Sequence, residues 1–454
     1  MADLRKERYG NQTLSKEERL TTFDEVSLTY DEETARKEAK RCLNCKHFPC
    51  VSGCPLKNNI PEFIALVAEG KFIEAYEVLN KTTSLPSICG RVCPKEKQCE
   101  GHCVRGKAGE SIAIGDLERF VAEYYYRHKQ TEVKTTHGDK KVAIIGGGPG
   151  GLSCARELLL LGYKVTIFEK EARLGGALTY ALPTFRLPSG AVENEVNKVI
   201  ELGAEVRLNT EINDLDSLLK EGYNAIFMAT GASKSKSLGI KGEELKGVYS
   251  ANDFLYQIRR VQLGEVNDEL PLADAKKILV IGGGNVAMDA ARSARRLGAE
   301  VIVIYRRTGA EMPAFKDEID HALEEGIEFM YLVNPVEFIG EDKVGKVVLT
   351  RNELGEADKS GRRRPIEIKG SEFILDNVDG IITAISSYPS SEFLKEKVEL
   401  TSWDGVIVDS DFKTSKEYVY AGGDLVTGPL TVIEAMVQGK KAALAIHDML
   451  IKKY

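Results

Sequence analysis

Residues 141–170, KVAIIGGGPGGLSCARELLLLGYKVTIFEK, decide the fold class of this chain. An apolar run, a glycine-rich turn, a helical pattern and a second apolar run follow one another, which predicts a strand, turn, helix and strand in that order. The same order returns at residues 276–307, KKILVIGGGNVAMDAARSARRLGAEVIVIYRR. Two such units predict two parallel, doubly wound sheets and therefore an α/β protein.

The first glycine turn has the G-x-G-x-x-G pattern of a dinucleotide site. Its glycines let the backbone approach a pyrophosphate, and the carboxylate that ends the next strand can accept hydrogen bonds from a ribose. A tight turn without a ligand is the structural alternative. Paired glycines and polar residues at later strand ends favour FAD over NAD. The residues expected at this FAD site are Gly146, Gly148, Pro149, Gly150, Gly151, Glu169, Lys170, Gly175, Gly176, Ala229, Thr230, Gly231, Gly423, Asp424 and Thr431.

The second glycine turn has the related pattern G-x-G-x-x-A, and the strand after it ends in two arginines instead of an acid. Guanidinium groups complement the 2′-phosphate of NADPH, so this pattern favours NADPH. NADH is the alternative nucleotide, and a solvated strand end is the alternative role for the arginines. The residues expected at this NADPH site are Gly282, Gly284, Asn285, Val286, Asp289, Arg306 and Arg307.

Eight of the nine cysteines lie between residues 42 and 103. In a reducing compartment such crowding indicates metal or redox chemistry more often than disulfides. In bacterial ferredoxins the last cysteine of a run, before a proline, binds the other cluster. By that rule Cys42, Cys45 and Cys50 bind one [4Fe-4S] cluster with a cysteine of the second group, and Cys54 joins the second group's cluster. That second group is Cys89, Cys93, Cys99 and Cys103. Zinc sites are the alternative.

The part of the chain before the first glycine turn reads as a separate helical domain. We expect a helical iron–sulfur domain over residues 1–135, with helices in 32–45, 61–81 and 115–129 and a polar stretch at 130–141. A new domain should start near Lys140, where the first glycine-rich unit begins.

Late segments of the chain read as strands. The charged residues 340–370 predict a β-hairpin, and the apolar residues 379–386 and 418–424 are buried-strand candidates that we expect to complete the first sheet.

Composition excludes some classes of partner. A net charge of -7 gives no general basic surface for nucleic acid. The first residues lack the apolar core of a secretory signal, and no run reaches the ~18 apolar residues of a membrane helix, which predicts a cytoplasmic protein without a membrane partner. Cys154 stands alone, without the second cysteine that a disulfide reductase needs beside its flavin.

Several motifs together resemble one family. The chain is similar to the small (β) subunit of NADPH-dependent glutamate synthase and its relatives, which include the large subunit of electron-bifurcating NADH-dependent ferredoxin:NADP oxidoreductase and the N-terminal part of dihydropyrimidine dehydrogenase. The motifs are EETARKEAKRCLNC (32–45), ICGRVCPKEKQCEGHC (88–103), IGDLERF (114–120), LPTFRLP (182–188), YRRTGAEMPA (305–314) and AGGDLVTGPLTVIEAMVQGKKAA (421–443), with the two glycine turns.

The resemblance implies that the FAD-binding domain comprises residues 136–248 and 376–454, and that the NADPH-binding domain, residues 249–375, is inserted in it.

The resemblance also implies ligands for two [4Fe-4S] clusters. One cluster would be held by Cys42, Cys45, Cys50 and Cys103, and the other by Cys54, Cys93, Cys99 and Glu118. Cys89 would then be a spare neighbour, although counting cysteines alone favours it over a carboxylate. The resemblance also implies that Arg186 lies near the flavin, where a cation stabilises the reduced ring.

The resemblance further implies an electron-transfer subunit that carries electrons from NADPH through FAD to the clusters. The acceptor would be a partner oxidoreductase subunit with a further flavin or iron–sulfur centres, as in glutamate synthase. An alternative is a bifurcating large subunit that also serves ferredoxin through its partner. An alternative of another class is a flavin-bearing assembly subunit without catalysis.

Overall fold

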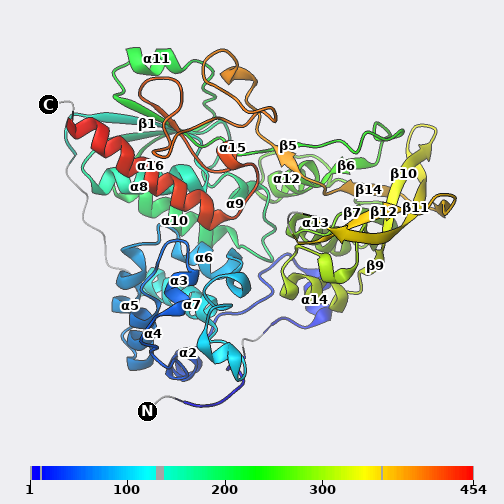
Figure 1. Cartoon of the computed structure of the whole chain (residues 1–454), viewed down its shortest axis with the longest axis horizontal. Helices are drawn as coiled ribbons and strands as arrows, with labels where there is room; N and C mark the ends of the chain where they lie inside the picture. The colour runs from blue at the N-terminus through cyan, green and yellow to red at the C-terminus, as the bar shows by residue number, and fades with distance from the viewer. Residues whose placement is uncertain (1–2, 11–12, 129–136, 359–360, 453–454) are drawn as a thin grey trace.

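Each glycine-rich unit builds one parallel sheet of five strands, and a helical region precedes both sheets (Figure 1). The computed structural model describes residues 3–10, 13–128, 137–358 and 361–452. The expected polar stretch falls outside these ranges over residues 130–136. The predicted α/β class is confirmed. Within the described ranges, no helix has the length and apolar character that crossing a bilayer requires.

The first sheet has the strand order β16-β4-β1-β2-β3, and all neighbouring strands are parallel. Alternate residues of β1 face opposite layers: Val142 and Ile144 pack with α8 and α16, whereas Ala143 and Ile145 pack with α11. The elements of this unit are β1 (Lys141–Ile145), α8 (Pro149–Leu160), β2 (Lys164–Phe168), α9 (Ala177–Tyr180), α10 (Ser189–Glu201), β3 (Glu205–Arg207), α11 (Leu215–Lys220), β4 (Ala225–Met228), β16 (Val419–Ala421), α15 (Asp424–Thr427) and α16 (Val432–Lys452).

The second sheet has the order β6-β14-β7-β8-β9 and is parallel throughout. One core joins this sheet to helices α12 and α13, with Val280, Ala290 and Phe254 among its fully buried residues. Its elements are β6 (Val248–Ser250), α12 (Ala251–Gln262), β7 (Lys277–Ile281), α13 (Asn285–Arg296), β8 (Glu300–Tyr305), α14 (Lys316–Glu324), β9 (Glu328–Tyr331) and β14 (Gly380–Thr383).

Antiparallel strands extend this second unit. They form one layer in which β11 pairs with β10, β12 and β13, and Figure 1 shows it projecting from the molecule beside β9. The β-hairpin predicted for residues 340–370 is therefore confirmed where the chain is described. The bounds are β10 (Val333–Gly340), β11 (Val344–Ala357), β12 (Arg363–Glu367) and β13 (Phe373–Asp376).

The strands of the second sheet lie between β4 and β16 of the first sheet in the sequence. The chain crosses over through β5 (Lys234–Ser235) and back through β15 (Ser387–Tyr388), and these two strands pair. The expected place of residues 379–386 is wrong: β14 pairs with β6 and β7, so it completes the second sheet, and a division at residue 376 falls too early. A short apolar strand carries no local mark of which parallel sheet it will join.

The helical region confirms the expected helices and divides one of them. The pattern over residues 61–81 forms two helices, because Gly70 takes the left-handed conformation (φ 84°) at the end of the first. The bounds are α1 (Lys16–Thr21), α2 (Glu32–Lys40), α3 (Pro49–Gly53), α4 (Ile60–Glu69), α5 (Phe72–Asn80), α6 (Pro86–Val92) and α7 (Ile114–His128), with short 3-10 turns at Lys95–Lys97 and Val104–Lys107.

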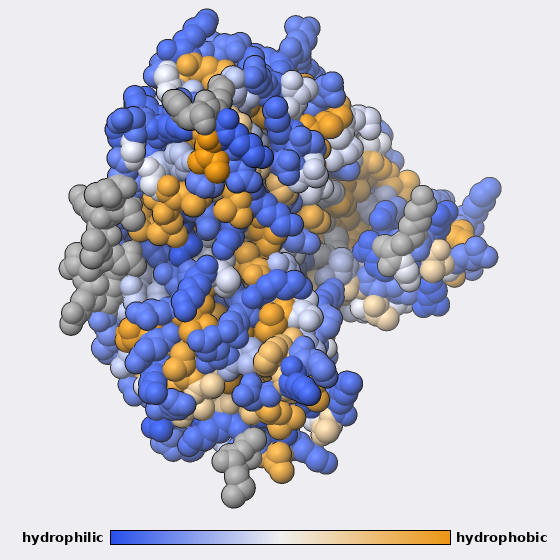
Figure 2. Space-filling model, turned by 60° about the vertical axis from the view of Figure 1, so that its left-hand side comes forward, coloured by the Kyte–Doolittle hydropathy of each residue, from blue (hydrophilic) through white to orange (hydrophobic). Residues whose placement is uncertain are grey.

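The surface carries scattered apolar residues. On the face drawn in Figure 2 hydrophilic residues predominate, and the apolar ones form separate patches. Exposed Leu43 and Phe48 lie within the first cysteine group, and Phe48 holds a left-handed backbone conformation (φ 44°).

Candidate flavin, nucleotide and iron–sulfur sites

The first glycine turn joins β1 to α8 and leaves the N-terminus of that helix open. A side chain at Gly151 would collide with the carbonyl oxygen of Gly146, so the turn and the helix pack closely only because glycine is present. A Cβ at Gly148 would meet nothing nearer than the Cα of Gly176, at 3.9 Å. The N–H groups at the start of α8, next to Pro149, therefore face free space of the kind that a pyrophosphate occupies.

Polar groups converge beside this turn. Glu169 is buried, and its carboxylate accepts hydrogen bonds from the N–H groups of Gly147 (2.8 Å) and Glu171 (3.0 Å). Burial raises the pKa of Glu169, against the effect of these bonds. Lys170 pairs with Glu171 at 3.7 Å. At the end of β4 the hydroxyl oxygen of Thr230 is buried without a hydrogen-bond partner among the described residues.

The C-terminal segment completes the site from the other side. Asp424 follows β16, and burial raises its pKa to about 6, although its Oδ1 accepts from the N–H of Leu430 (3.2 Å). Thr431 donates from its backbone and its hydroxyl to Glu434, at 3.0 and 2.7 Å, just before α16 begins. A Cβ at Gly150 would contact the carbonyl oxygen of Ala435 at 3.4 Å. The structure therefore brings the expected FAD residues of the two segments together.

The second glycine turn repeats this geometry between β7 and α13. Gly284 precedes the helix, and a Cβ there would reach only the ring of Pro313, at 4.0 Å. Asn285 accepts a hydrogen bond from the N–H of Phe315 (2.9 Å), and Val286 is 44% exposed at the helix start. A second nucleotide pyrophosphate therefore fits this open helix N-terminus.

The two arginines after β8 have different surroundings. Arg306 is exposed. Arg307 is buried, pairs with Asp358 at 2.9 Å and donates to the carbonyl oxygen of Arg363 at 2.6 Å. The sequence suggested a pair of equivalent cations, but only Arg306 has its guanidinium exposed to solvent. No local signal could have identified Asp358, because it comes from the antiparallel layer far along the chain.

Arg186 and Asp289 contact each other. The Nη1 of Arg186 lies 2.8 and 2.7 Å from the two carboxylate oxygens of Asp289, and its Nε lies 3.1 Å from Glu318. Asp289 and Glu318 belong to α13 and α14 of the second unit. We expected the guanidinium of Arg186 beside the flavin and the carboxylate of Asp289 beside NADPH. In the structure these two groups bind each other.

Four thiols line one cavity in the helical region: those of Cys42, Cys45, Cys50 and Cys103. Burial, with smaller contributions from the neighbouring Cys42 and Cys103, raises the pKa of the Cys50 thiol to about 11. Among the described residues no three His, Cys, Asp or Glu side chains converge on a single-ion site. A four-iron cluster binds each thiolate at a different iron, so thiols around a hollow fit it.

A second group gathers Cys54, Cys89, Cys93, Cys99 and Glu118. Burial is the main cause that raises the pKa of Cys54, and the neighbouring Glu118 and Cys93 raise it further. Burial is also the main cause that raises the pKa of Cys99, followed by Glu100 and then by Glu118, Cys93 and Cys54. Burial, with Glu195 second, raises the pKa of Glu118 itself to about 8. Its Oε1 has no hydrogen-bond partner within the described part of the chain. A buried carboxylate left unsatisfied among thiols fits a metal ligand.

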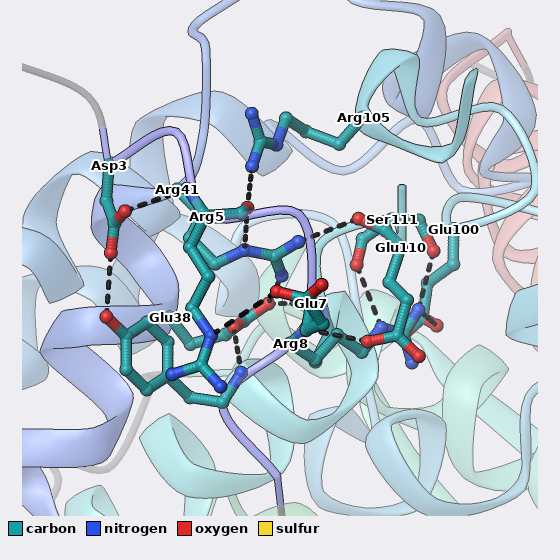
Figure 3. A network of polar contacts seen from close by, with 12 residues as sticks. Asp3, Arg5, Glu7, Arg8, Glu38, Arg41, Glu100, Arg105, Glu110 and Ser111 are labelled. Carbon is teal, nitrogen blue, oxygen red and sulfur yellow. Dashed lines mark hydrogen bonds and ion pairs between the residues drawn. The ribbon is translucent and has the colours of Figure 1, made fainter. Parts of the chain in front are cut away.

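A polar network holds the two cysteine segments together against the start of the chain (Figure 3). Arg41 is fully buried, pairs with Glu38 at 2.6 Å and donates to the carbonyl oxygen of Glu110 at 2.8 Å. Arg8 pairs with Glu100 at 2.6 Å. Arg41 directly precedes the first cysteine and Glu100 follows Cys99, so these contacts set how the two ligand segments approach each other.

Cys89 joins the second cysteine group to the flavin side of the molecule. Its Sγ lies 3.8 Å from the Sδ of Met436 on α16, and both residues are buried. The hydroxyl of Ser153 on α8 donates to the carbonyl oxygen of Met436 at 2.9 Å. The sequence suggested no role for Met436, because a methionine in an apolar helix face is an ordinary core residue.

Two family descriptions match this chain. Residues 19–130 match the family described as dihydropyrimidine dehydrogenase domain II, 4Fe-4S cluster. Residues 140–439 match the family described as pyridine nucleotide-disulphide oxidoreductase. The helical region is thus a 4Fe-4S cluster domain, and the two sheets form FAD- and NAD(P)-binding Rossmann-like domains.

Relatives match over nearly the whole chain. The small chain of NADPH glutamate synthase from Escherichia coli (strain K12) is 38% identical over 95% of each protein. The same subunit from Azospirillum brasilense is 35% identical over 95% of this chain and 92% of its own length. The NADP(+)-dependent formate dehydrogenase subunit beta of Moorella thermoacetica is 38% identical over 88% of this chain but only 60% of its own. Such relatives are subunits of larger oxidoreductases.

Solved structures support the fold. FprA, an oxidoreductase from Mycobacterium tuberculosis, aligns with a TM-score of 0.59 at 20% identity, over 70% of this chain and 86% of its own. Thioredoxin reductase from T. acidophilum aligns with a TM-score of 0.50 at 22% identity, over 69% of this chain and all of its own. With a full-length match to glutamate synthase small chains and both cofactor-binding regions present, the chain belongs to the glutamate synthase small-chain family of flavin- and iron–sulfur-containing oxidoreductases.

Proposed function

We propose that this chain carries electrons from NADPH through FAD and two [4Fe-4S] clusters to a partner subunit. A bound FAD would supply the chemistry that links a two-electron donor to clusters that accept one electron at a time. The contact between Cys89 and Met436 carries this proposal. It joins the second cysteine group to the helix that begins at the flavin site, and both side chains are buried, so protein instead of water fills the space between the two sites.

The nucleotide-binding residues act by binding and orientation. The open N-termini of α8 and α13 would each hold a pyrophosphate, and Glu169 would accept from the FAD ribose. The unpartnered hydroxyl of Thr230 is available to the flavin. Arg306, exposed at the end of β8, would pair with the 2′-phosphate of NADPH. The proposal requires no side-chain acid or nucleophile.

The ligand sets follow the two side-chain groups. Cys42, Cys45, Cys50 and Cys103 would hold one cluster. Cys54, Cys93, Cys99 and Glu118 would hold the other. The unsatisfied Oε1 of Glu118 supports this carboxylate as the fourth ligand over Cys89, whose thiol already contacts Met436.

The acceptor is proposed to be a separate oxidoreductase subunit with its own flavin or iron–sulfur centres. The first cysteine cavity supports this, because it lies near the surface between exposed Leu43 and Phe48. The relatives support a subunit role, since both the glutamate synthase small chain and the formate dehydrogenase subunit beta are parts of larger enzymes.

Anaerobic purification and rapid mixing with NADPH test the central step. We expect flavin absorbance that bleaches within seconds, followed by electron paramagnetic resonance signals of reduced clusters, and weaker reduction by NADH. Flavin that NADPH does not bleach would favour the assembly subunit without catalysis. A colourless protein, without flavin, iron or sulfide, would refute both.

A pull-down under anaerobic conditions, followed by assays with the captured partner, tests the acceptor. NADPH oxidation that requires glutamine and 2-oxoglutarate would support a glutamate synthase. Ferredoxin reduction that requires two different nucleotides would instead support bifurcation, and the glutamate synthase assignment would then be wrong.

A further inference from the structure

A buried junction connects the unit of the first sheet to the unit of the second. Its first component is the loop at residues 183–187, PTFRL, between α9 and α10. Its second is the pair of helices α13 and α14. Its third is a strap, residues 13–27, which contains α1. The strap extends away from the rest of the helical region and lies beside α13 and α14 (Figure 1).

Arg186 is the residue of the loop that crosses the junction. Its Nη1 contacts both carboxylate oxygens of Asp289, at 2.8 and 2.7 Å, and its Nε lies 3.1 Å from Glu318. The side chain of Arg186 is only 6% exposed, and that of Asp289 is 2% exposed. An ion pair in such surroundings is weakly screened, and removing one partner leaves the other charge buried and unpaired.

The charges of the junction balance. Arg186, Arg292 and Arg296 face Asp289, Glu318 and Glu325. Arg292 contacts Glu318 at 2.5 Å and Glu325 at 2.7 Å, and Arg296 contacts Glu325 at 2.8 Å. Three guanidinium groups are thus matched by three carboxylates, which is the condition for burying such a cluster. Arg186 is the only one of the six that the first unit supplies, so it alone joins this network to that unit.

Phe185 adds an apolar contact to the ionic one. The guanidinium carbons of Arg292 and Arg296 lie 4.6 and 4.0 Å from the centre of its ring, which is a cation–π arrangement on a buried ring. The loop therefore enters the second unit with two consecutive side chains.

The strap closes the junction from outside. The N–H of Val26 donates to the carbonyl oxygen of Phe185 (3.0 Å), and the hydroxyl of Thr184 donates to the carbonyl oxygen of Phe23 (2.7 Å). On the other side, Arg296 donates to the carbonyl oxygen of Thr22 at 3.1 Å. The same short segment thus holds both the loop of the first unit and a helix of the second.

We propose that Arg186 is a positioning residue that fixes α13 in one orientation relative to the first sheet. Asp289 lies on α13 one turn after the second glycine turn, so holding Asp289 also holds the helix N-terminus that would bind the nucleotide pyrophosphate. The relative orientation of the two glycine turns decides where a nicotinamide reaches relative to a flavin. The expected effect on flavin reduction by NADPH rests on the proposed function. The claim that Arg186 fixes the orientation of α13 does not.

Hydrogen–deuterium exchange of the cofactor-loaded chain tests the structural claim. Arg186→Met, which keeps an unbranched apolar stem but removes the guanidinium, should raise exchange at least about tenfold in residues 184–187 and in α13, because a buried pair is broken. Arg186→Lys, which keeps the charge but cannot span Asp289 and Glu318 as a planar group, should give an intermediate increase. Arg156→Met is the matched control: the side chain of Arg156 is equally buried, at 6% exposed, but donates to Asn80 of the helical region, so its loss should leave exchange at the junction unchanged.

Rapid mixing with NADPH tests the consequence. The limiting rate of flavin reduction should fall at least about tenfold in Arg186→Met, with the NADPH dissociation constant changed less than about threefold, since misplacement affects the reaction more than binding. Unchanged exchange in either Arg186 variant would refute the proposal. A shift in flavin midpoint potential without a change in exchange would also refute it, and would indicate that Arg186 acts on the flavin itself. If NADPH fails to reduce the flavin of the unaltered chain, the proposed function fails, while the exchange data still decide the role of Arg186.

Discussion

At the scale of single residues, Glu118 and Cys89 compete to complete one cluster. Glu118 is buried with an unsatisfied oxygen, and burying a carboxylate is costly unless it is paired or coordinates a metal. Glu118→Ala should therefore lower the iron content of the anaerobically prepared chain by about half, because one of the two proposed [4Fe-4S] clusters would be lost. Iron and sulfide analysis and electron paramagnetic resonance would measure this. Cys89→Ala is the control and should keep both clusters; the opposite pattern would make Cys89 the ligand.

Arg306 and Arg307 are neighbours in the sequence with different expected effects. Arg306→Ala should raise the dissociation constant for NADPH by about tenfold or more, since a hydrogen bond to a charged group contributes about 1.5–3 kcal/mol, and should hardly affect NADH. Titration of both nucleotides measures this. Arg307→Met should mainly lower the unfolding temperature, because Arg307 is buried against Asp358. An equal loss of NADPH affinity in both variants would contradict this division.

At the scale of elements, the packing of α16 on α8 holds two segments of the flavin site together. A side chain at Gly439 on α16 would collide with the carbonyl oxygen of Gly150 at the start of α8. Gly439→Ala should therefore cost about 1–3 kcal/mol of stability through overpacking and lower the flavin content. Flavin absorbance per chain and thermal unfolding check this result.

Gly190 supplies the control for that change. It lies in α10, and a Cβ there would meet nothing within 4 Å. Gly190→Ala should leave flavin content unchanged and be neutral or stabilising by about 0.5 kcal/mol. If both glycine variants kept their flavin equally, the contact between the two helices would not matter for the site.

Local patterns predicted most elements but not all their partners. The helix after each glycine turn and the antiparallel hairpin follow from periodicity and turn residues within a few positions. Strand β14 was assigned to the wrong sheet, because its neighbours Val248 and Ile278 lie far away in the sequence. The strap was not predicted, since its hydrogen bond from Val26 to Phe185 joins segments that lie far apart in the sequence.

At the scale of the whole molecule, we expect the three parts to depend differently on their cofactors. The helical region is built from short helices joined by irregular cysteine segments, so much of its folding energy should come from its clusters. Each sheet has its own apolar core, whereas the core of the helical region includes Cys54 and packs against five further cysteines. Oxidative removal of the clusters should therefore make the helical region sensitive to protease while both sheets resist, as mass spectrometry of the fragments would reveal. Simultaneous degradation of all parts would contradict this independence.

The sequence by itself determined the two nucleotide-binding units and the thiol-rich head. These properties depend on residues close together in the chain, where backbone geometry and periodicity act directly. Tertiary structure alone decided that Arg307 pairs with Asp358 and that Arg186 reaches Asp289. Each of these contacts joins distant segments, and the partner of a charge depends on which side chains the completed fold buries beside it.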